Sequence, residues 1–149
     1  MSERTKKKRV LFLCTGNSCR SQMAEGLLRH LAGTRFVAES AGTNPTRINP
    51  LAIRVMAEIA IDISGQRSKP VEEMMVEPFD YLITVCDRAR EACPVFPGAA
   101  LRLHWSFEDP AEAVGTEDER LIVFRRVRDQ IAAQISRFCS NDAYLRTAS

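Results

Sequence analysis

A cysteine and an arginine with five residues between them, Cys14 and Arg20, follow directly after an apolar run at residues 10–13. A helical pattern begins immediately afterwards. A loop between a buried strand and a helix N-terminus collects backbone N–H groups that point at one spot, where an oxyanion can bind. Arginine can also bind two oxygens of such an anion with its planar guanidinium. We therefore expect residues 14–21 to bind a tetrahedral anion and to aim the Cys14 thiolate at its central atom.

The expected oxyanion ligands in this loop are Thr15, Gly16, Asn17, Ser18, Cys19 and Arg20. The same donors should lower the pKa of Cys14, because an ordinary cysteine with a pKa near about 8.5 is only about 3% thiolate at neutral pH. The alternative is that Cys14 is a small core residue at the end of a buried strand, with a chance spacing to Arg20. The glycine, the hydroxyl of Ser21 and the strand-then-helix context favour the nucleophile.

Composition indicates an ordinary globular protein. The chain has 149 residues, of which 45% are apolar and 27% charged, and its formal net charge of +2 is too small to indicate a nucleic-acid partner. The basic run at residues 4–9 is interpreted as a solvated tail. No apolar run approaches the roughly 18 residues of a membrane span, and no signal peptide is recognised, so we expect a cytoplasmic protein with reduced thiols. Its five cysteines then indicate chemistry or core filling.

Four short apolar runs predict strands at residues 8–13, 36–38, 81–85 and 100–103. Three amphipathic patterns predict helices with apolar faces formed by Ala24, Leu27, Leu28 and Leu31, by Ala52, Val55, Met56, Ile59 and Ala60, and by Phe124, Val127, Ile131, Ile135 and Phe138. Asn49 with Pro50 should start the second helix, and Thr116 with Glu119 forms a capping box for the last.

This alternation predicts an α/β fold: a single three-layer domain, with a four-stranded parallel sheet and helices on both faces. We expect a basic N-terminal tail at residues 1–8, the domain at residues 9–140 and a C-terminal tail at residues 141–149. Ligands of such sheets bind at the carboxyl ends of the strands. Cys14 and Cys86 both lie at such ends, so the two thiols should meet.

Cys86 and Cys93 form a second pair, with six residues between them. In a helix their Cα atoms would lie roughly 10 Å apart, whereas a disulfide needs about 4.4–6.8 Å. The polar segment between them, ended by Pro94, could unwind to allow a reversible disulfide. There are two alternatives: the two cysteines bind zinc, with His104 as a neighbour, or they have no chemical role.

An acidic pair, Glu108 and Asp109, precedes Pro110 in the long loop at residues 104–116. An acid before proline is usually part of a turn. If the loop folds over the strand ends, one of the two can protonate an oxygen leaving group. Asp109 is the favoured proton donor and Glu108 is its rival.

Together these residues resemble the thioredoxin-coupled arsenate reductases, which share their fold with the low-molecular-weight protein tyrosine phosphatases. The resemblance covers nearly the whole chain. Its motifs are C-T-G-N-S-C-R-S-Q-M-A-E at 14–25, E-S-A-G-T at 39–43, D-I-S at 62–64, T-V-C-D at 84–87, A-C-P-V-F-P at 92–97, H-W-S-F-E-D-P at 104–110 and F-R-R-V-R-D at 124–129. The pair Cys86 and Cys93 and the motif at 104–110 are more specific to the reductases than the first loop is.

The resemblance implies a relay of three thiols that reduces arsenate, with phosphate or sulfate as competing anions. Cys14 attacks arsenate while Asp109 protonates the departing oxygen, Cys86 then attacks Cys14 and arsenite leaves, and Cys93 moves the disulfide to residues 86 and 93. Thioredoxin reduces that disulfide. Ser21 is expected to donate to the Cys14 sulfur or merely to cap the helix.

The resemblance also implies that Asn17 orders the loop. No tightly bound cofactor or metal is expected. Some members hold potassium near Asn17, Glu25 and Ser40, but here the loop after D-I-S carries Lys69. Our hypothesis is that the Lys69 ammonium takes the position of the ion and pairs with Glu25. Cys19 and Cys139 have no role in the relay, and the chain is expected to be a monomer.

The main alternative is a tyrosine phosphatase that uses only Cys14, Arg20 and Asp109. Those phosphatases typically follow Asp-Pro with an aromatic residue, whereas Ala111 follows here. A weak activity on aryl phosphates is expected in either case. A third possibility is a non-catalytic module that binds phosphate or protein.

Overall fold

The structure is a computed structural model that describes residues 7–86, 89 and 101–148, with side chains described as far as residue 141. Its elements, in chain order, are β1 (Lys8–Cys14), α1 (Arg20–Ala32), β2 (Phe36–Gly42), α2 (Pro50–Ala57), the 3-10 helix η1 (Val71–Val76), β3 (Tyr81–Thr84), β4 (Leu101–His104), the 3-10 helix η2 (Pro110–Glu112) and α4 (Glu117–Ala148). All four predicted strands are present, and β2 is longer than expected.

The four strands form one parallel sheet in the order β2-β1-β3-β4. Parallel strands bring their carboxyl ends to the same edge of a sheet. Cys14 ends β1 beside Gly42 of β2, and Cys86 follows two residues after β3. The predicted meeting of the two cysteines at one edge therefore has its structural basis in this topology.

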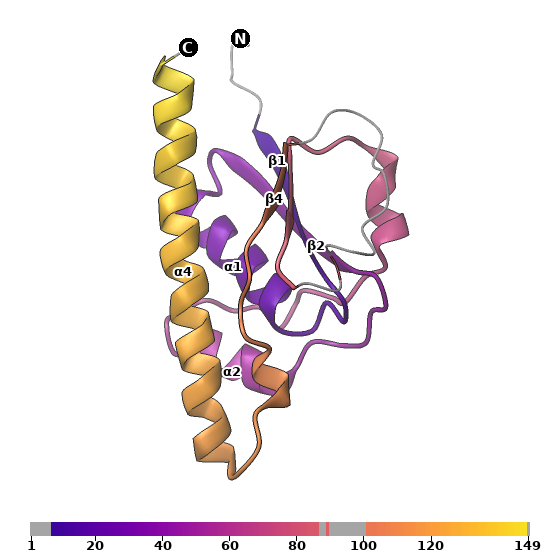
Figure 1. Cartoon of the computed structure of the whole chain (residues 1–149), viewed down its shortest axis with the longest axis vertical. Coiled ribbons are helices and arrows are strands. Elements are labelled where there is room, and N and C mark those ends of the chain that lie inside the picture. The colour runs from indigo at the N-terminus through magenta and orange to yellow at the C-terminus, as the bar shows by residue number, and fades with distance from the viewer. Residues whose placement is uncertain (1–6, 87–88, 90–100, 149) are drawn as a thin grey trace.

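The layers are visible in Figure 1, where α1, α2 and α4 lie to one side of the strands and η1 lies to the other. The sheet supplies the centre of the core, since the side chains from Val10 to Leu13 are fully buried. The predicted α/β fold, with one domain and helices on both faces, is confirmed. Within the described ranges, no helix combines the length and the apolar character that a membrane span requires.

The last helix begins at the predicted capping box. The Thr116 backbone N–H donates to Glu119 Oε1 at 2.7 Å, and the Glu119 N–H donates to Thr116 Oγ1 at 3.1 Å. The whole predicted apolar face of α4 is buried: Phe124, Val127, Ile131, Ile135 and Phe138. The helix continues through residues 141–148, the segment expected to be a tail.

Two details of the helical prediction are wrong. Leu31 is 50% exposed, because the buried row of α1 runs through Ala24, Leu28 and Ala32 and leaves Leu31 outside it. Ile59 and Ala60 lie beyond the end of α2, and both are exposed. Ala60 has a φ of 64°, so the chain turns away from the helix there. The start of α2 is as predicted, since Asn49 Oδ1 accepts the Leu51 N–H at 2.9 Å.

Candidate functional site

The loop that joins β1 to α1, here called the anion loop (residues 14–20), is held by its carbonyl oxygens. Four backbone amides of the segment after β2 donate to it: Thr43 to Cys14 at 3.1 Å, Asn44 to Thr15 at 2.8 Å, Thr46 to Gly16 at 3.0 Å and Asn49 to Ser18 at 3.1 Å. Because the carbonyls point outward to these donors, the N–H groups of the loop can turn inward. The Asn17 N–H does so, since it donates to Cys14 Sγ at 3.1 Å.

Gly42 permits this close pairing. A Cβ at this position would lie 2.5 Å from the Thr15 carbonyl oxygen and 2.9 Å from Asn17 Cβ, so any larger residue would push the anion loop away. This glycine was predicted only as part of the motif at 39–43, and its role could not be predicted because the strand that it ends, β2, is longer than expected.

Ser21 is hydrogen-bonded to the nucleophile. Its Oγ lies 2.9 Å from Cys14 Sγ and accepts a hydrogen bond from Asn17 Nδ2 at 2.8 Å. The Asn17 amide is oriented by the Lys69 backbone N–H, which donates to Asn17 Oδ1 at 2.8 Å. Since Ser21 already accepts from Asn17, its own proton is available to Cys14 Sγ. The structure favours this role over helix capping, because Cys19 is the N-cap residue of α1.

The predicted lowering of the Cys14 pKa is wrong in direction. Cys14 is only 3% exposed, and burial raises the pKa of its thiol above the ordinary value. The hydrogen bonds from Ser21 and the charge of Arg20 act to lower the pKa, while the neighbouring Cys86 thiol raises it further. The donors that the sequence analysis invoked are therefore present, but desolvation outweighs them.

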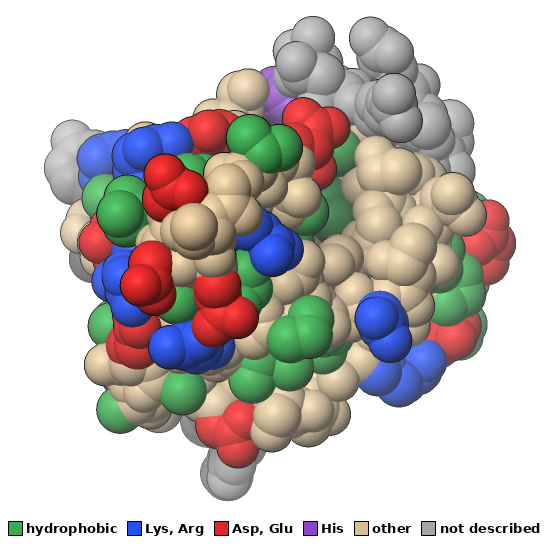
Figure 2. All heavy atoms as spheres, turned by 90° about the horizontal axis from the view of Figure 1, so that it is seen from below, with side chains coloured by type: hydrophobic (Ala, Val, Ile, Leu, Met, Phe, Trp, Pro, Cys, Tyr) green, Lys and Arg blue, Asp and Glu red, His purple; other side chains and the backbone are tan. Residues whose placement is uncertain are grey.

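A cavity of about 450 Å³ opens in front of the anion loop. Its lining residues are Cys14, Thr15, Gly16, Ser18, Cys19, Arg20, Cys86, Asp109, Ala111 and Glu112. Figure 2 views the molecule from this side, where the surface is hollowed and acidic and basic side chains are interspersed. The structure thus brings together nearly all the predicted site residues. Asn17 and Ser21 do not line the cavity, because both side chains are fully buried, and Asn17 has a φ of 49°.

Arg20 connects the anion loop to the loop at residues 105–116, here called the acid loop. Its Nη1 donates to the Phe107 carbonyl at 3.0 Å, and its Nη2 lies 3.5 Å from Asp109 Oδ2. Glu108 points elsewhere, because its Oε1 accepts from Arg126 of α4 at 2.8 Å. Between the two acids, the geometry favours Asp109 as the proton donor.

Cys86 is 6% exposed and contacts the anion loop. Its Sγ lies 3.4 Å from Thr15 Oγ1 and accepts from the Ala89 N–H at 3.4 Å. Both contacts can stabilise a thiolate. Thr15 was predicted to bind the anion, whereas its contact with Cys86 was not predicted. Cys93, the third cysteine of the predicted relay, lies outside the described residues.

The two remaining cysteines are Cys19, whose Sγ lies 3.7 Å from Ser18 Oγ, and Cys139. Cys19 lines the cavity, but burial raises its pKa to about 12. Cys139 lies on α4, where its carbonyl accepts from Arg35 at 2.9 Å.

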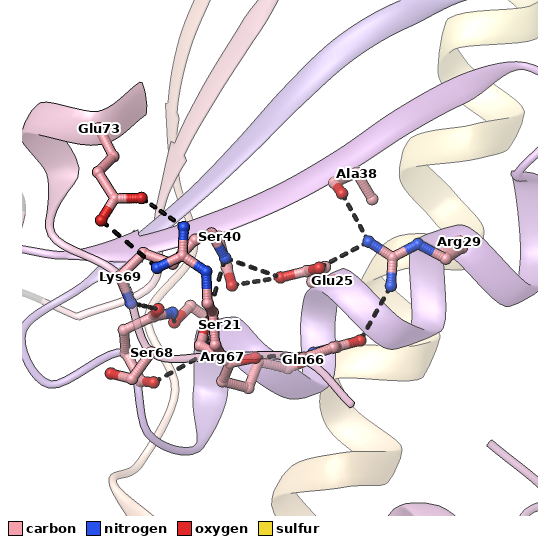
Figure 3. Close-up of polar contacts among 12 residues, drawn as sticks. Ser21, Glu25, Arg29, Ala38, Ser40, Gln66, Arg67, Ser68, Lys69 and Glu73 are labelled. Carbon is pink, nitrogen blue, oxygen red and sulfur yellow. Dashed lines mark hydrogen bonds and ion pairs between the residues drawn. The ribbon is translucent and has the colours of Figure 1, made fainter. Parts of the chain in front are cut away.

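A segment at residues 66–69, here called the backing segment, supports the anion loop from behind (Figure 3). Ser68 Oγ donates to the Gly16 carbonyl at 3.0 Å. Gln22 Nε2 donates both to the Asn17 carbonyl at 3.1 Å and to the Arg67 carbonyl at 2.9 Å. The segment is therefore joined to the loop directly by the Ser68 side chain and through the Gln22 side chain, which bridges the Asn17 and Arg67 carbonyls.

The predicted ion pair between Lys69 and Glu25 is present, with Lys69 Nζ 3.7 Å from Glu25 Oε1. Glu25 also accepts from Ser40 Oγ and, at 2.6 Å, from Arg29. The described part of the chain contains no cluster of three or more His, Cys, Asp or Glu side chains that could hold a metal ion.

Comparison with known proteins agrees with this geometry. The family model for low molecular weight phosphotyrosine protein phosphatase matches residues 9–146. An arsenate reductase of Halalkalibacterium halodurans is 46% identical over 132 residues, which cover 89% of this chain and 95% of that protein. A solved arsenate reductase in the phosphate binding state has a TM-score of 0.73 at 34% identity, and the match covers 90% of this chain and 98% of the other.

A thioredoxin-dependent arsenate reductase of Corynebacterium glutamicum has a TM-score of 0.72 at 29% identity, and the match covers 92% of this chain and 62% of that one. The sequence and structural matches agree on the same fold. The chain belongs to the low-molecular-weight phosphotyrosine protein phosphatase family and, within it, to the arsenate reductases.

Proposed function

We propose that this protein reduces arsenate to arsenite through a relay of thiols regenerated by thioredoxin. The observation that carries the proposal is that Cys14 and Cys86 line one cavity together with Arg20 and Asp109. A phosphatase needs the first thiol, the arginine and the acid. Reduction of arsenate also needs a second thiol that can attack the first, and Cys86, which contacts Thr15 of the anion loop, can supply it.

In the first step, arsenate binds to the inward N–H groups of the anion loop and to the Arg20 guanidinium. The Cys14 thiolate attacks arsenic and forms a sulfur–arsenic bond, while one arsenate oxygen leaves as water. Asp109 supplies the proton to that oxygen. The Ser21 hydroxyl, 2.9 Å from Cys14 Sγ, stabilises the thiolate before the attack.

In the second step, the Cys86 thiolate attacks Cys14 Sγ. A disulfide forms between residues 14 and 86, the sulfur–arsenic bond breaks, and its electron pair stays with arsenic, which leaves as arsenite. The Thr15 hydroxyl, 3.4 Å from Cys86 Sγ, can stabilise the attacking thiolate. Cys93 then attacks Cys86 and frees Cys14, and the dithiol of thioredoxin reduces the resulting disulfide.

The partners follow from this chemistry. Phosphate and sulfate have the shape and charge of arsenate and should compete for the anion loop. A relay that depends on reduced thiols works in the cytoplasm, where thiols are kept reduced. We further propose that the protein acts as a monomer without a tightly bound cofactor, and that the Lys69 ammonium replaces a potassium ion beside Glu25. A rate that rose steeply with potassium but not with sodium would count against the last point.

The direct test is NADPH consumption that depends on arsenate, in the presence of thioredoxin and thioredoxin reductase. The Cys93→Ser variant should complete one stoichiometric turnover, accumulate the disulfide between residues 14 and 86, and then stop. Cys139→Ser is the matched control and should turn over normally. Repeated turnovers with thioredoxin in Cys93→Ser would refute the relay.

Hydrolysis of phosphate monoesters is the second candidate, because Cys14, Arg20 and Asp109 suffice for it. We expect only weak activity on aryl phosphates, since Ala111 offers the cavity no aromatic ring for a substrate to stack on. Cys86→Ser separates the two functions: it should abolish arsenate reduction and retain phosphatase activity.

A further inference from the structure

A buried cation lies behind the anion loop. The Lys69 side chain is 7% exposed, and its Nζ lies 3.3 Å from the Arg67 carbonyl oxygen and 3.7 Å from Glu25 Oε1. Glu25 is buried as deeply, at 5% exposure, and already accepts hydrogen bonds from Arg29 and Ser40. Desolvation of two charges largely cancels their attraction, so a buried ion pair is weak support for stability. Its presence here calls for another explanation.

The backbone of the same residue reaches the nucleophile. The Lys69 N–H donates to Asn17 Oδ1 at 2.8 Å, Asn17 Nδ2 donates to Ser21 Oγ at 2.8 Å, and Ser21 Oγ lies 2.9 Å from Cys14 Sγ. The Lys69 carbonyl accepts from the Gly42 N–H at 2.8 Å. Lys69 is thus held by its side chain beside Glu25 (Figure 3), and its backbone orients a chain of hydrogen bonds that leads to Cys14.

We propose that Lys69 is a positioning residue for the nucleophile. Its ammonium, held by Glu25 and the Arg67 carbonyl, fixes the backbone N–H that orients the Asn17 amide. That amide directs the Ser21 proton toward Cys14 Sγ. If the ammonium is lost, the backing segment can shift, and Asn17 no longer holds Ser21 in the orientation that stabilises the thiolate.

This inference rests on the proposed function only in taking Cys14 as the nucleophile. Its test measures the reactivity of Cys14 directly and needs neither arsenate nor thioredoxin. The rate at which iodoacetamide alkylates Cys14 reports the thiolate fraction, and mass spectrometry of the Cys14 peptide identifies the site. Among the described residues, the ionisable groups that line the cavity in front of the sulfur are Arg20 at the start of α1, Cys19 in the anion loop, Cys86 after β3, and Asp109 and Glu112 of the acid loop. None of them is changed in the variants below.

Ser21→Ala removes the donor and should slow alkylation at pH 7 by roughly tenfold, with the midpoint of the pH profile moved upward. Lys69→Met keeps the apolar stem and should move the midpoint in the same direction. The double variant should be no slower than Ser21→Ala alone, because both substitutions interrupt one chain. Lys69→Arg retains the charge and should stay close to the wild type.

Arg67→Met is the matched control. It lies on the same segment and loses an exposed ion pair with Glu73, and it should alkylate at the wild-type rate. Glu25→Gln provides a second route if Lys69→Met does not fold, and it should produce the same upward shift. A wild-type pH profile in Lys69→Met or Glu25→Gln would overturn the proposal. So would a double variant whose slowing equals the product of the two single effects.

Discussion

The anion loop and the acid loop face the same cavity but are held in place by different kinds of contact. In the anion loop, each carbonyl from Cys14 to Ser18 accepts a hydrogen bond, and most of the donors are backbone amides. The acid loop is anchored by long side chains: Arg20 binds the Phe107 carbonyl and Arg126 binds Glu108. Asp109 itself caps η2 by accepting the Ala111 N–H at 3.0 Å.

This difference matches the tasks of the two loops. A loop that binds an anion works best when its donors are fixed before the anion arrives, because no reorganisation is then needed during the reaction. A proton donor must approach the leaving oxygen and afterwards let the product go. We infer that the anion loop is preorganised and that the position of the acid loop is adjustable.

Arg20→Lys should have the largest effect, because Arg20 belongs to the anion loop and its guanidinium also holds the acid loop. An ammonium cannot bind two anion oxygens as a fork while it also holds the Phe107 carbonyl. We expect kcat/KM for arsenate to fall by about 10²–10³-fold. Steady-state reduction assays measure this loss. Arg137→Lys, on an exposed part of α4, is the control and should behave as the wild type. A loss below fivefold would show that the loops do not depend on this guanidinium.

Asp109→Asn should slow the first covalent step by about 10²-fold, because the amide cannot protonate the leaving oxygen. Single-turnover experiments with rapid quenching isolate that step, because they measure how fast the bond between Cys14 and arsenic forms. Glu108→Gln serves as the control, since Glu108 faces Arg126. If Glu108→Gln slows the step more than Asp109→Asn does, the roles of the two acids are reversed.

Gly42→Ala tests the rigidity of the anion loop. Its new Cβ would lie 2.5 Å from the Thr15 carbonyl oxygen, so the loop must shift at a cost of about 1–3 kcal/mol in the free energy of unfolding. We expect a roughly tenfold fall in kcat/KM with it, since displaced donors bind the anion less well. Urea unfolding and steady-state kinetics provide the two readouts. Gly65→Ala is the matched control, because a Cβ there meets no atom within 4 Å. Equal behaviour of the two variants would mean that the loop is adjustable after all.

The sequence predicted the anion loop well because its information is local. A strand, a glycine-containing loop and a helix start follow one another within residues 8–32, so their order alone places Cys14 and Arg20 at the carboxyl end of the sheet. The capping box of α4 was equally local. Burial at a helix end is less local, which explains the errors at Leu31 and Ile59. The net burial of the Cys14 sulfur, and hence the direction of its pKa shift, also depends on distant parts of the chain.

Unlike the meeting of Cys14 with Cys86, which the parallel sheet predicted, two other contacts between distant segments could not be predicted. The close approach of Gly42 to Thr15 depends on the pairing of β1 with β2. The backing segment is distant in sequence from the loop that it supports, since Ser68 and Gly16 are 52 residues apart. The ion pair of Lys69 with Glu25 was expected only through the resemblance to a family. The choice between Glu108 and Asp109 as proton donor depended on the ion pair of Glu108 with Arg126. That pair could not be predicted, because Arg126 lies 18 residues away on α4.

Arg126→Gln should have the smallest effect on kcat/KM, and it tests most directly whether the acid loop is adjustable while the anion loop is rigid. The pair with Glu108 is about half exposed on both sides, and such surface pairs contribute roughly 0–1 kcal/mol. If the acid loop is adjustable, the loss of this ion pair should lower kcat/KM by no more than about threefold. The difference from the wild type should become smaller at high salt. Adding Glu108→Gln to Arg126→Gln should cause no further loss of kcat/KM. Arg54→Gln, which breaks the surface pair with Glu117 outside the acid loop, is the control. A tenfold loss of kcat/KM in Arg126→Gln alone would mean that the acid loop is held as rigidly as the anion loop. A weak surface ion pair can affect the rate that strongly only if catalysis requires the loop to keep one position.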